Sequence, residues 1–131
     1  MPGMEKLTKK SKILLVEDDA LIRDYIAGLL TSSGYSVTTA RSSAESLDLI
    51  AAGLAPDLLF TDIMIAGGMN GIELARQAQG ILPDMKVLFT SGYAGAAGQQ
   101  PLPTGAEFLQ KPFRRLRCIE KVQSILAKSA P

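Results

Sequence analysis

The sequence predicts an α/β fold: a doubly wound, five-stranded parallel sheet of order 2-1-3-4-5, with helices on both faces in three layers. Apolar runs at 13–16, 58–61 and 87–89 predict the three central strands, because a strand covered on both faces is apolar throughout. Five predicted strands alternate with helical segments, which is typical of right-handed βαβ units. The 131 residues suffice for one such domain.

The first strand, Ile13–Val16, is followed by three consecutive acids and then by an amphipathic helix. Asp18 or Asp19 can cap this helix, and Gly34 ends it. Apolar residues at helical spacing predict one buried face. The residues predicted on that face are Leu21, Ile22, Tyr25, Ile26, Leu29 and Leu30.

The second strand, at 36–40, is short and polar, which predicts an edge strand. Ser42 and Glu45 are the two ends of a capping-box pattern, which predicts a helix that extends to Gly53. The apolar central strand that follows ends at Asp62.

A Gly-rich loop at 67–71 leads into a third helix that ends before Pro83. The fourth strand, at 86–91, ends in hydroxyl residues. The segment 94–100 has almost no apolar anchors, so at most a loose helix is expected there. The third helix is expected to carry Ile72, Ala75, Ala78 and Gln79 on one face.

The last unit is a strand at 106–110, a turn at Lys111-Pro112 and a final helix. The spacing of apolar residues in this helix predicts one buried stripe. That stripe consists of Leu116, Ile119, Val122 or Gln123, and Leu126.

The composition excludes several kinds of chemistry. The chain has no histidine, so His-based catalysis, phosphohistidine formation on the chain itself and His-ligated metal sites are excluded. The single cysteine, Cys118, rules out an internal disulfide and suits a reducing cytoplasm. A net charge of +1 gives no electrostatic argument for nucleic acid or a membrane as a partner. No apolar run reaches the ~18 residues of a membrane span, so we expect a cytoplasmic protein.

The predicted domain covers residues 12–128. Residues 1–11 are expected to form a flexible basic leader without the apolar core of a signal peptide, and residues 129–131 a short tail.

Acidic side chains follow two strands that are neighbours in the predicted order. Glu17 and Asp18 follow the first strand, and Asp62 ends the third. The carboxyl ends of parallel strands open into one crevice, so we expect these three residues to meet there. Two carboxylates ~4 Å apart repel by roughly 4 kcal/mol at an effective dielectric of 20, and a hard divalent ion relieves this repulsion. Oxygen ligands without His or Cys favour Mg²⁺.

A cation and a hydroxyl are predicted at the ends of the two remaining strands. Lys111 follows the fifth strand, and Ser91 or Thr90 ends the fourth. Mg²⁺, an ammonium and a hydroxyl around a carboxylate form a cradle for three phosphoryl oxygens, and phosphoryl transfer is stabilised chiefly by positioning and charge neutralisation. The sequence therefore predicts Asp62 as a nucleophile that forms an acyl phosphate.

Together these features resemble the receiver domain of two-component response regulators, a flavodoxin-like phospho-acceptor domain. The resemblance runs from about Lys12 to Lys128. Each motif alone is weakly specific, but acids, acceptor and Lys-Pro on successive strand ends in this order are highly specific. The matching motifs are Val16-Glu17-Asp18-Asp19, Asp62 with Met64, Gly71, Ser91-Gly92 and Phe108-Leu109-Gln110-Lys111-Pro112-Phe113.

The resemblance implies a role for each acidic residue. Asp62 is the phospho-acceptor, and Asp18 and Asp62 bind Mg²⁺ directly. Glu17 acts on the metal mainly through water, and the backbone carbonyl of Met64 is a further ligand.

The resemblance also implies roles at the fourth and fifth strands. Lys111 contacts the phosphoryl group, and its peptide bond to Pro112 is expected to be cis. Ser91 is the switch hydroxyl, with Thr90 as the alternative, and Phe108 is the aromatic switch residue.

The function implied is to accept a phosphoryl group from a phosphohistidine on a histidine kinase or histidine phosphotransfer protein. The signal would then pass through contacts with a downstream protein, with phosphorylation-dependent dimerisation left open. Such a protein is not an enzyme in the usual sense, since it catalyses only its own Mg²⁺-dependent phosphorylation and slow autodephosphorylation. No DNA-binding output module is expected, whether the chain stands alone or belongs to a hybrid kinase.

Two other functions remain open. A pseudo-receiver would dock to a partner without being phosphorylated, although the presence of all the acids and of Lys111 argues against it. A small Asp-nucleophile phosphatase would carry Asp-x-Asp on its first strand, and neither Asp18 nor Asp19 has an acid two positions later.

Overall fold

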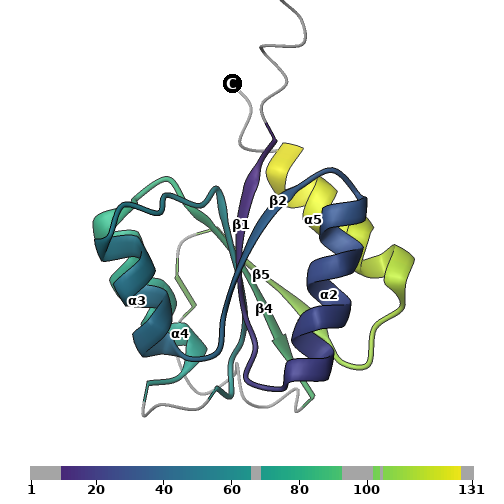
Figure 1. Cartoon of the computed structure of the whole chain (residues 1–131), viewed down its shortest axis with the longest axis horizontal. Helices are drawn as coiled ribbons and strands as arrows, with labels where there is room; N and C mark the ends of the chain where they lie inside the picture. Colours follow the sequence, from purple (N-terminus) through teal and green to yellow (C-terminus); the bar gives the residue numbers. More distant parts are fainter. Residues whose placement is uncertain (1–9, 66–68, 93–101, 104, 128–131) are drawn as a thin grey trace, which may run out of the picture.

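The computed structural model describes residues 10–65, 69–92, 102–103 and 105–127. Five parallel strands form one sheet in the order β2-β1-β3-β4-β5, which confirms the predicted topology (Figure 1). The loose helix expected at 94–100 lies outside the described residues, as do most of the leader and all of the tail. The strands are β1 (Lys12–Val16), β2 (Ser36–Ala40), β3 (Leu58–Asp62), β4 (Lys86–Ser91) and β5 (Ala106–Gln110).

In the described part of the chain, four helices cover the sheet. Figure 1 shows α3 and α4 together on one face and α2 and α5 together on the other, which confirms the predicted three layers. Of these helices, none is both long and apolar enough to cross a membrane. The helices are α2 (Ala20–Ser32), α3 (Ser43–Ala51), α4 (Gly71–Ile81) and α5 (Arg115–Ala127).

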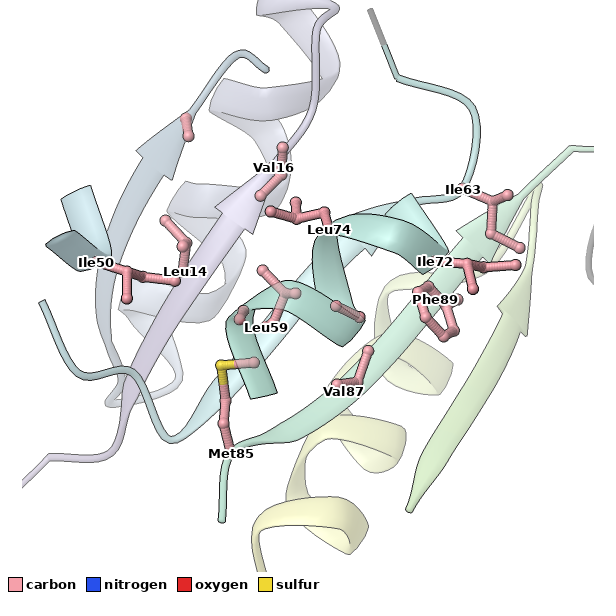
Figure 2. Packing of buried hydrophobic residues seen from close by; sticks show 13 residues of the cluster. Leu14, Val16, Ile50, Leu59, Ile63, Ile72, Leu74, Met85, Val87 and Phe89 are labelled. Carbon is pink, nitrogen blue, oxygen red and sulfur yellow. The ribbon is translucent and has the colours of Figure 1, made fainter. Parts of the chain in front are cut away.

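Successive residues of the central strands point into two different cores, because side chains alternate across a sheet. Leu59 packs in the core beneath α3 and α4, whereas its neighbour Phe60 packs in the core beneath α2 and α5. Figure 2 shows the first of these cores, with Ile72 of α4 and Phe89 of β4 near one end and Met85 near the other. The central strands are buried on both faces, as their apolar runs predict.

The predicted buried face of α2 is too wide. Ile26 and Leu30 are buried, but Leu21 is 83% exposed, and Ile22 and Tyr25 are exposed as well. Successive helical residues are turned by about 100°, so Leu21 and Tyr25 lie to one side of the narrow stripe that faces the sheet. An apolar patch therefore remains on the outer surface of α2.

The predicted stripe on α5 is also wrong in part. The helix buries Cys118, Val122 and Ile125, whereas Leu116 is 69% exposed. Of the predicted residues, Val122 is buried and Leu126 packs partly against the same core. Two apolar stripes about 100° apart occur in this sequence, and helical periodicity alone does not distinguish them.

Side chains cap the N-termini of α2, α3 and α4. Asp19 caps α2, since its Oδ1 accepts hydrogen bonds from the amides of Leu21 at 2.9 Å and Ile22 at 3.1 Å. Ser42 caps α3 through the amide of Glu45, as predicted, but the Glu45 carboxylate returns to the amide of Arg41 rather than to that of Ser42. Asp19 is therefore occupied as a cap, which distinguishes it from Asp18.

Candidate functional site

The ends of β1, β3 and β5 bring three charged residues to one edge of the sheet. Val16 pairs with Thr61 in the β1–β3 register, so Glu17 and Asp62 follow side by side. Ser91 pairs with Gln110 in the β4–β5 register, and Lys111 comes next. The sheet topology thus unites Glu17, Asp62 and Lys111, whereas Asp18, which is also predicted to meet Asp62, is exposed and forms no three-carboxylate group with them among the described residues.

Lys111 forms ion pairs with both of these carboxylates. Its Nζ lies 2.7 Å from Oδ2 of Asp62 and 3.1 Å from Oε1 of Glu17. The amide of Lys111 donates to the carbonyl of Ser91 at 2.9 Å, and the Lys111-Pro112 peptide bond is cis, as expected. The ammonium of Lys111, which follows β5, therefore contacts carboxylates at the ends of β1 and β3, and neither of these strands is a neighbour of β5.

Glu17 is the most enclosed member of this group. Its side chain is 4% exposed, and its Oε2 accepts a hydrogen bond from the amide of Asp19 at 3.1 Å. Burial raises the pKa of Glu17, and the charge of Asp62 adds to this rise, while the Asp19 amide and Lys111 oppose it. Burial lowers the pKa of Lys111, but the hydrogen bonds and charges of Asp62 and Glu17 outweigh this effect, and the net shift is upward.

Both carboxylate oxygens of Asp62 are held in place. Oδ2 accepts from Lys111, and Oδ1 accepts from the amide of Met64 at 3.1 Å. The Asp62 side chain is 12% exposed, and the Met64 side chain beside it is 66% exposed. Asp62 is therefore restrained in orientation and still accessible from outside.

The backbone around Asp62 requires a glycine at the start of α4. The amide of Gly71 donates to the carbonyl of Ile63 at 2.8 Å, which brings the two segments into contact. A Cβ at Gly71 would overlap the carbonyl oxygen of Asp62 and would lie 3.1 Å from the Cα of Ile63. Gly71 belongs to the motifs that resemble the family, but the sequence pattern does not reveal that Gly71 approaches the backbone of Asp62.

The site has the donor chemistry for Mg²⁺. Glu17 and Asp62 contribute carboxylates from adjacent strand ends, and Asp18 is exposed directly beside Glu17. Hard cations prefer such oxygen ligands. Within the described ranges, however, no three His, Cys, Asp or Glu residues are gathered so as to hold a metal ion. The Lys111 ammonium is the cation that joins Glu17 to Asp62 in this arrangement.

The sequence profile of the family described as "Response regulator receiver domain" matches residues 13–123 of the chain. The match covers the five strands except for Lys12, the first residue of β1, and all but the end of the last helix. The chain belongs to this family. Receiver domains are signalling modules of two-component systems rather than conventional enzymes.

Known receiver proteins resemble the chain over nearly all of its length. It is 35% identical over 117 residues to the response regulator receiver protein CpdR of Brucella abortus, covering 88% of this chain and 96% of CpdR. It is 34% identical over 125 residues to the sensor kinase CckA of the same organism, covering 93% of this chain but 13% of CckA. The crystal structure of a response regulator receiver protein from Sinorhizobium medicae superposes with a TM-score of 0.84 at 28% identity, covering 93% of this chain and 98% of that one.

Two hydroxyl residues at the end of β4 lie close to the receiver's acidic pocket. Thr90 pairs with Asp62 in the β3–β4 register, and its carbonyl accepts from the amide of Ile63 at 2.9 Å. Ser91, the last residue of β4, is buried like Thr90. The choice of Ser91 over Thr90 as the switch hydroxyl stays a prediction.

Phe108 of β5 is partly buried and packs against the core beneath α3 and α4. It also lines a surface groove of about 440 Å³ together with Phe113, Arg114 and Arg117. Its role as an aromatic switch in this receiver also stays a prediction.

A second pocket, of about 440 Å³, lies beside Lys111. Ile22 and Tyr25 of α2 line it, with Pro112 and Phe113 from the loop after β5. Apolar spacing predicts Ile22 and Tyr25 on the buried face of the helix, so this surface has no signal in the sequence pattern. Their exposure follows from the orientation of α2, which apolar spacing does not determine to within one residue.

Proposed function

We propose that this receiver domain accepts a phosphoryl group on Asp62 from a phosphohistidine of a histidine kinase or histidine phosphotransfer protein. The observation that carries this proposal is the Asp62 carboxylate, restrained by the Lys111 ammonium at 2.7 Å and the Met64 amide at 3.1 Å while still partly exposed. A restrained, accessible carboxylate next to a fixed positive charge is what an in-line phosphoryl acceptor requires.

In the proposed step, a carboxylate oxygen of Asp62 attacks phosphorus as the bond from phosphorus to the imidazole nitrogen breaks. The electron pair of the broken bond stays on the imidazole, and the product is an acyl phosphate. Lys111 contributes positive charge at the acceptor oxygen, where the phosphoryl oxygens would gather.

The proposed metal is Mg²⁺, which when bound neutralises charge on the phosphoryl oxygens. Asp18, Asp62 and the backbone carbonyl of Met64 would hold it directly, with Glu17 acting through water. This assignment is supported by the oxygen-only donors at the ends of β1 and β3. It requires the exposed carboxylate of Asp18 to come within reach of the same ion as Asp62.

The phosphorylated state would act through protein contacts in the cytoplasm. Ser91, with Thr90 as the alternative, and Phe108 are the proposed switch residues, because they lie on the two strands between Asp62 and the groove lined by Arg114. A phosphate that favours one of two packings of these residues shifts the population toward that packing.

The proposal is tested by incubating the full chain with acetyl phosphate and Mg²⁺ and measuring its intact mass. Asp62→Asn should abolish the adduct of one phosphoryl group, and omission of Mg²⁺ should strongly reduce it. Asp48→Asn is the matched control, because Asp48 is an exposed carboxylate on α3. A wild-type chain without an Asp62-dependent adduct would support the alternative, a pseudo-receiver that only docks to partners.

A further inference from the structure

Arg23 of α2 contacts the loop 17–19, which follows β1 and carries three acidic residues. Its Nη1 donates a hydrogen bond to the backbone carbonyl of Glu17 at 2.9 Å. Its own amide donates to the carbonyl of the cap residue Asp19, also at 2.9 Å, which is an ordinary backbone bond of α2. The Arg23 side chain therefore binds the 17–19 loop at Glu17, although it lies outside every motif that identifies the family.

Several hydrogen bonds fix Glu17, the first residue of the loop that Arg23 contacts. The amide of Glu17 donates to the carbonyl of Ala40 at 3.1 Å, and the Glu17 carboxylate accepts from the Asp19 amide and from Lys111. The β1–β3 pairing ends at Val16, one residue before the loop. A buried carbonyl just beyond a strand needs a hydrogen-bond donor, and Arg23 provides one for Glu17.

The guanidinium of Arg23 is used for this contact and not for an ion pair. In the described ranges no carboxylate lies within salt-bridge distance of Arg23, whereas Arg41 pairs with Glu45. A charged donor forms a stronger hydrogen bond to a carbonyl than a neutral donor does. The contact therefore fixes the position of Glu17 and, through the chain, of Asp18.

We propose that Arg23 is a positioning residue for the acidic pocket. By bracing the Glu17 carbonyl, it sets the direction in which the loop presents the carboxylates of Glu17 and Asp18. This inference rests on the proposed function where it concerns Mg²⁺, but not where it concerns the order of the loop. Partners that orient metal ligands from outside are typically worth 10–100-fold in metal affinity.

The sign of the effect distinguishes bracing from simple electrostatics. A positive charge near carboxylates repels Mg²⁺, so if charge were the main effect of Arg23, its removal would tighten Mg²⁺ binding. If bracing dominates, removal of Arg23 loosens the loop and weakens Mg²⁺ binding. The two effects predict opposite changes in the same dissociation constant.

The test compares Arg23→Ala and Arg23→Lys with Arg41→Ala, which removes an exposed arginine whose side chain pairs with Glu45. Mg²⁺ dissociation constants are measured on the full chain from amide chemical shifts. We expect Arg23→Ala to weaken binding roughly tenfold, Arg23→Lys to recover part of the loss, and Arg41→Ala to leave binding unchanged. Unchanged or tighter binding in Arg23→Ala would overturn the proposal.

A second measurement needs no metal. The Asp19 amide, which donates to Glu17, reports the order of the loop through its hydrogen-exchange rate. We expect this amide to exchange roughly tenfold faster in Arg23→Ala, while core amides of β3 keep their protection. Equal exchange of the Asp19 amide in wild type and variant would remove the bracing role, even if the chain bound no Mg²⁺ at all.

Discussion

The ammonium of Lys111 lies 2.7 Å from Oδ2 of Asp62, although β4 separates the strands that carry the two residues. The same ammonium lies 3.1 Å from Glu17, so one cation compensates two carboxylates that would otherwise repel each other. The pocket therefore depends on Lys111 for stability as well as for the proposed chemistry.

Replacement of Lys111 should destabilise the fold. Lys111→Met leaves two enclosed carboxylates without their cation, and we expect a loss of about 2 kcal/mol in the free energy of unfolding at neutral pH without divalent ions. Urea denaturation measures this loss. Lys121→Met is the control, because it breaks a pair with Glu107 at 3.2 Å that no second carboxylate shares in the described structure. An equal loss in both variants would contradict the bridging role.

Glu17 should make stability fall as pH rises. Its pKa is raised above the ordinary value of 4.5, chiefly by burial, so the folded state holds this proton more tightly than the unfolded chain does. Its contribution is fully present below pH 4.5 and is lost as pH rises through the raised pKa. Lys111 does not interfere, since its pKa is raised above 10.5, so its contribution to stability is constant below that pH and declines only above it.

The variant Glu17→Gln tests this pH dependence because the amide does not ionise. Urea midpoints are measured from weakly acidic to neutral pH without divalent ions. The difference between Glu17→Gln and wild type should shift progressively in favour of the variant as pH rises. Parallel pH profiles for the two proteins would show that Glu17 has no raised pKa.

Gly71→Ala should destabilise the protein by about 1–3 kcal/mol, the usual cost of forcing extra volume into a packed site. The added Cβ meets the backbone of Asp62, which cannot move without displacing the acceptor. Gly80→Ala is the matched control on the same helix, since a Cβ there meets no atom within 4 Å. Thermal unfolding of both variants measures the difference, and equal midpoints would refute the close approach.

Asp18 and Asp19 should differ in function although they are adjacent. Asp19→Ala removes the cap of α2 and should lower stability by about 1 kcal/mol with little change in Mg²⁺ affinity. Asp18→Ala should weaken Mg²⁺ binding with little change in stability, since Asp18 is exposed and is a proposed metal ligand. Denaturation and Mg²⁺ titration of the pair measure both quantities. Similar behaviour of the two variants would invalidate the distinction.

Cys118 should be unreactive in the folded protein. Burial raises the pKa of its thiol to about 11, so little thiolate forms at neutral pH, and the side chain belongs to the core beneath α2 and α5. Iodoacetamide should label Cys118 in urea and not in buffer. Labelling of the folded protein at the rate of a free thiol would show that α5 opens locally.

The strand pattern predicted most of the fold and most of the pocket. Apolar runs that end in Asp62 or in Glu17 are local signals, and the doubly wound order brings such ends together. The faces of α2 and α5 were harder to predict, because stripes one residue apart are equally periodic and packing decides between them. The hydrogen bond from Arg23 to the Glu17 carbonyl and the close approach of Gly71 to the Asp62 carbonyl depend on the folded positions of these segments, which apolar periodicity does not reveal.

The alternation of side chains along β3 has a mechanical consequence. Leu59 is anchored on one side of the sheet and Phe60 on the other, and Asp62 is the last residue of the same strand. The strand that ends in this carboxylate is thus anchored in both helical layers, so a displacement of Asp62 would have to strain or repack side chains on opposite faces of the sheet.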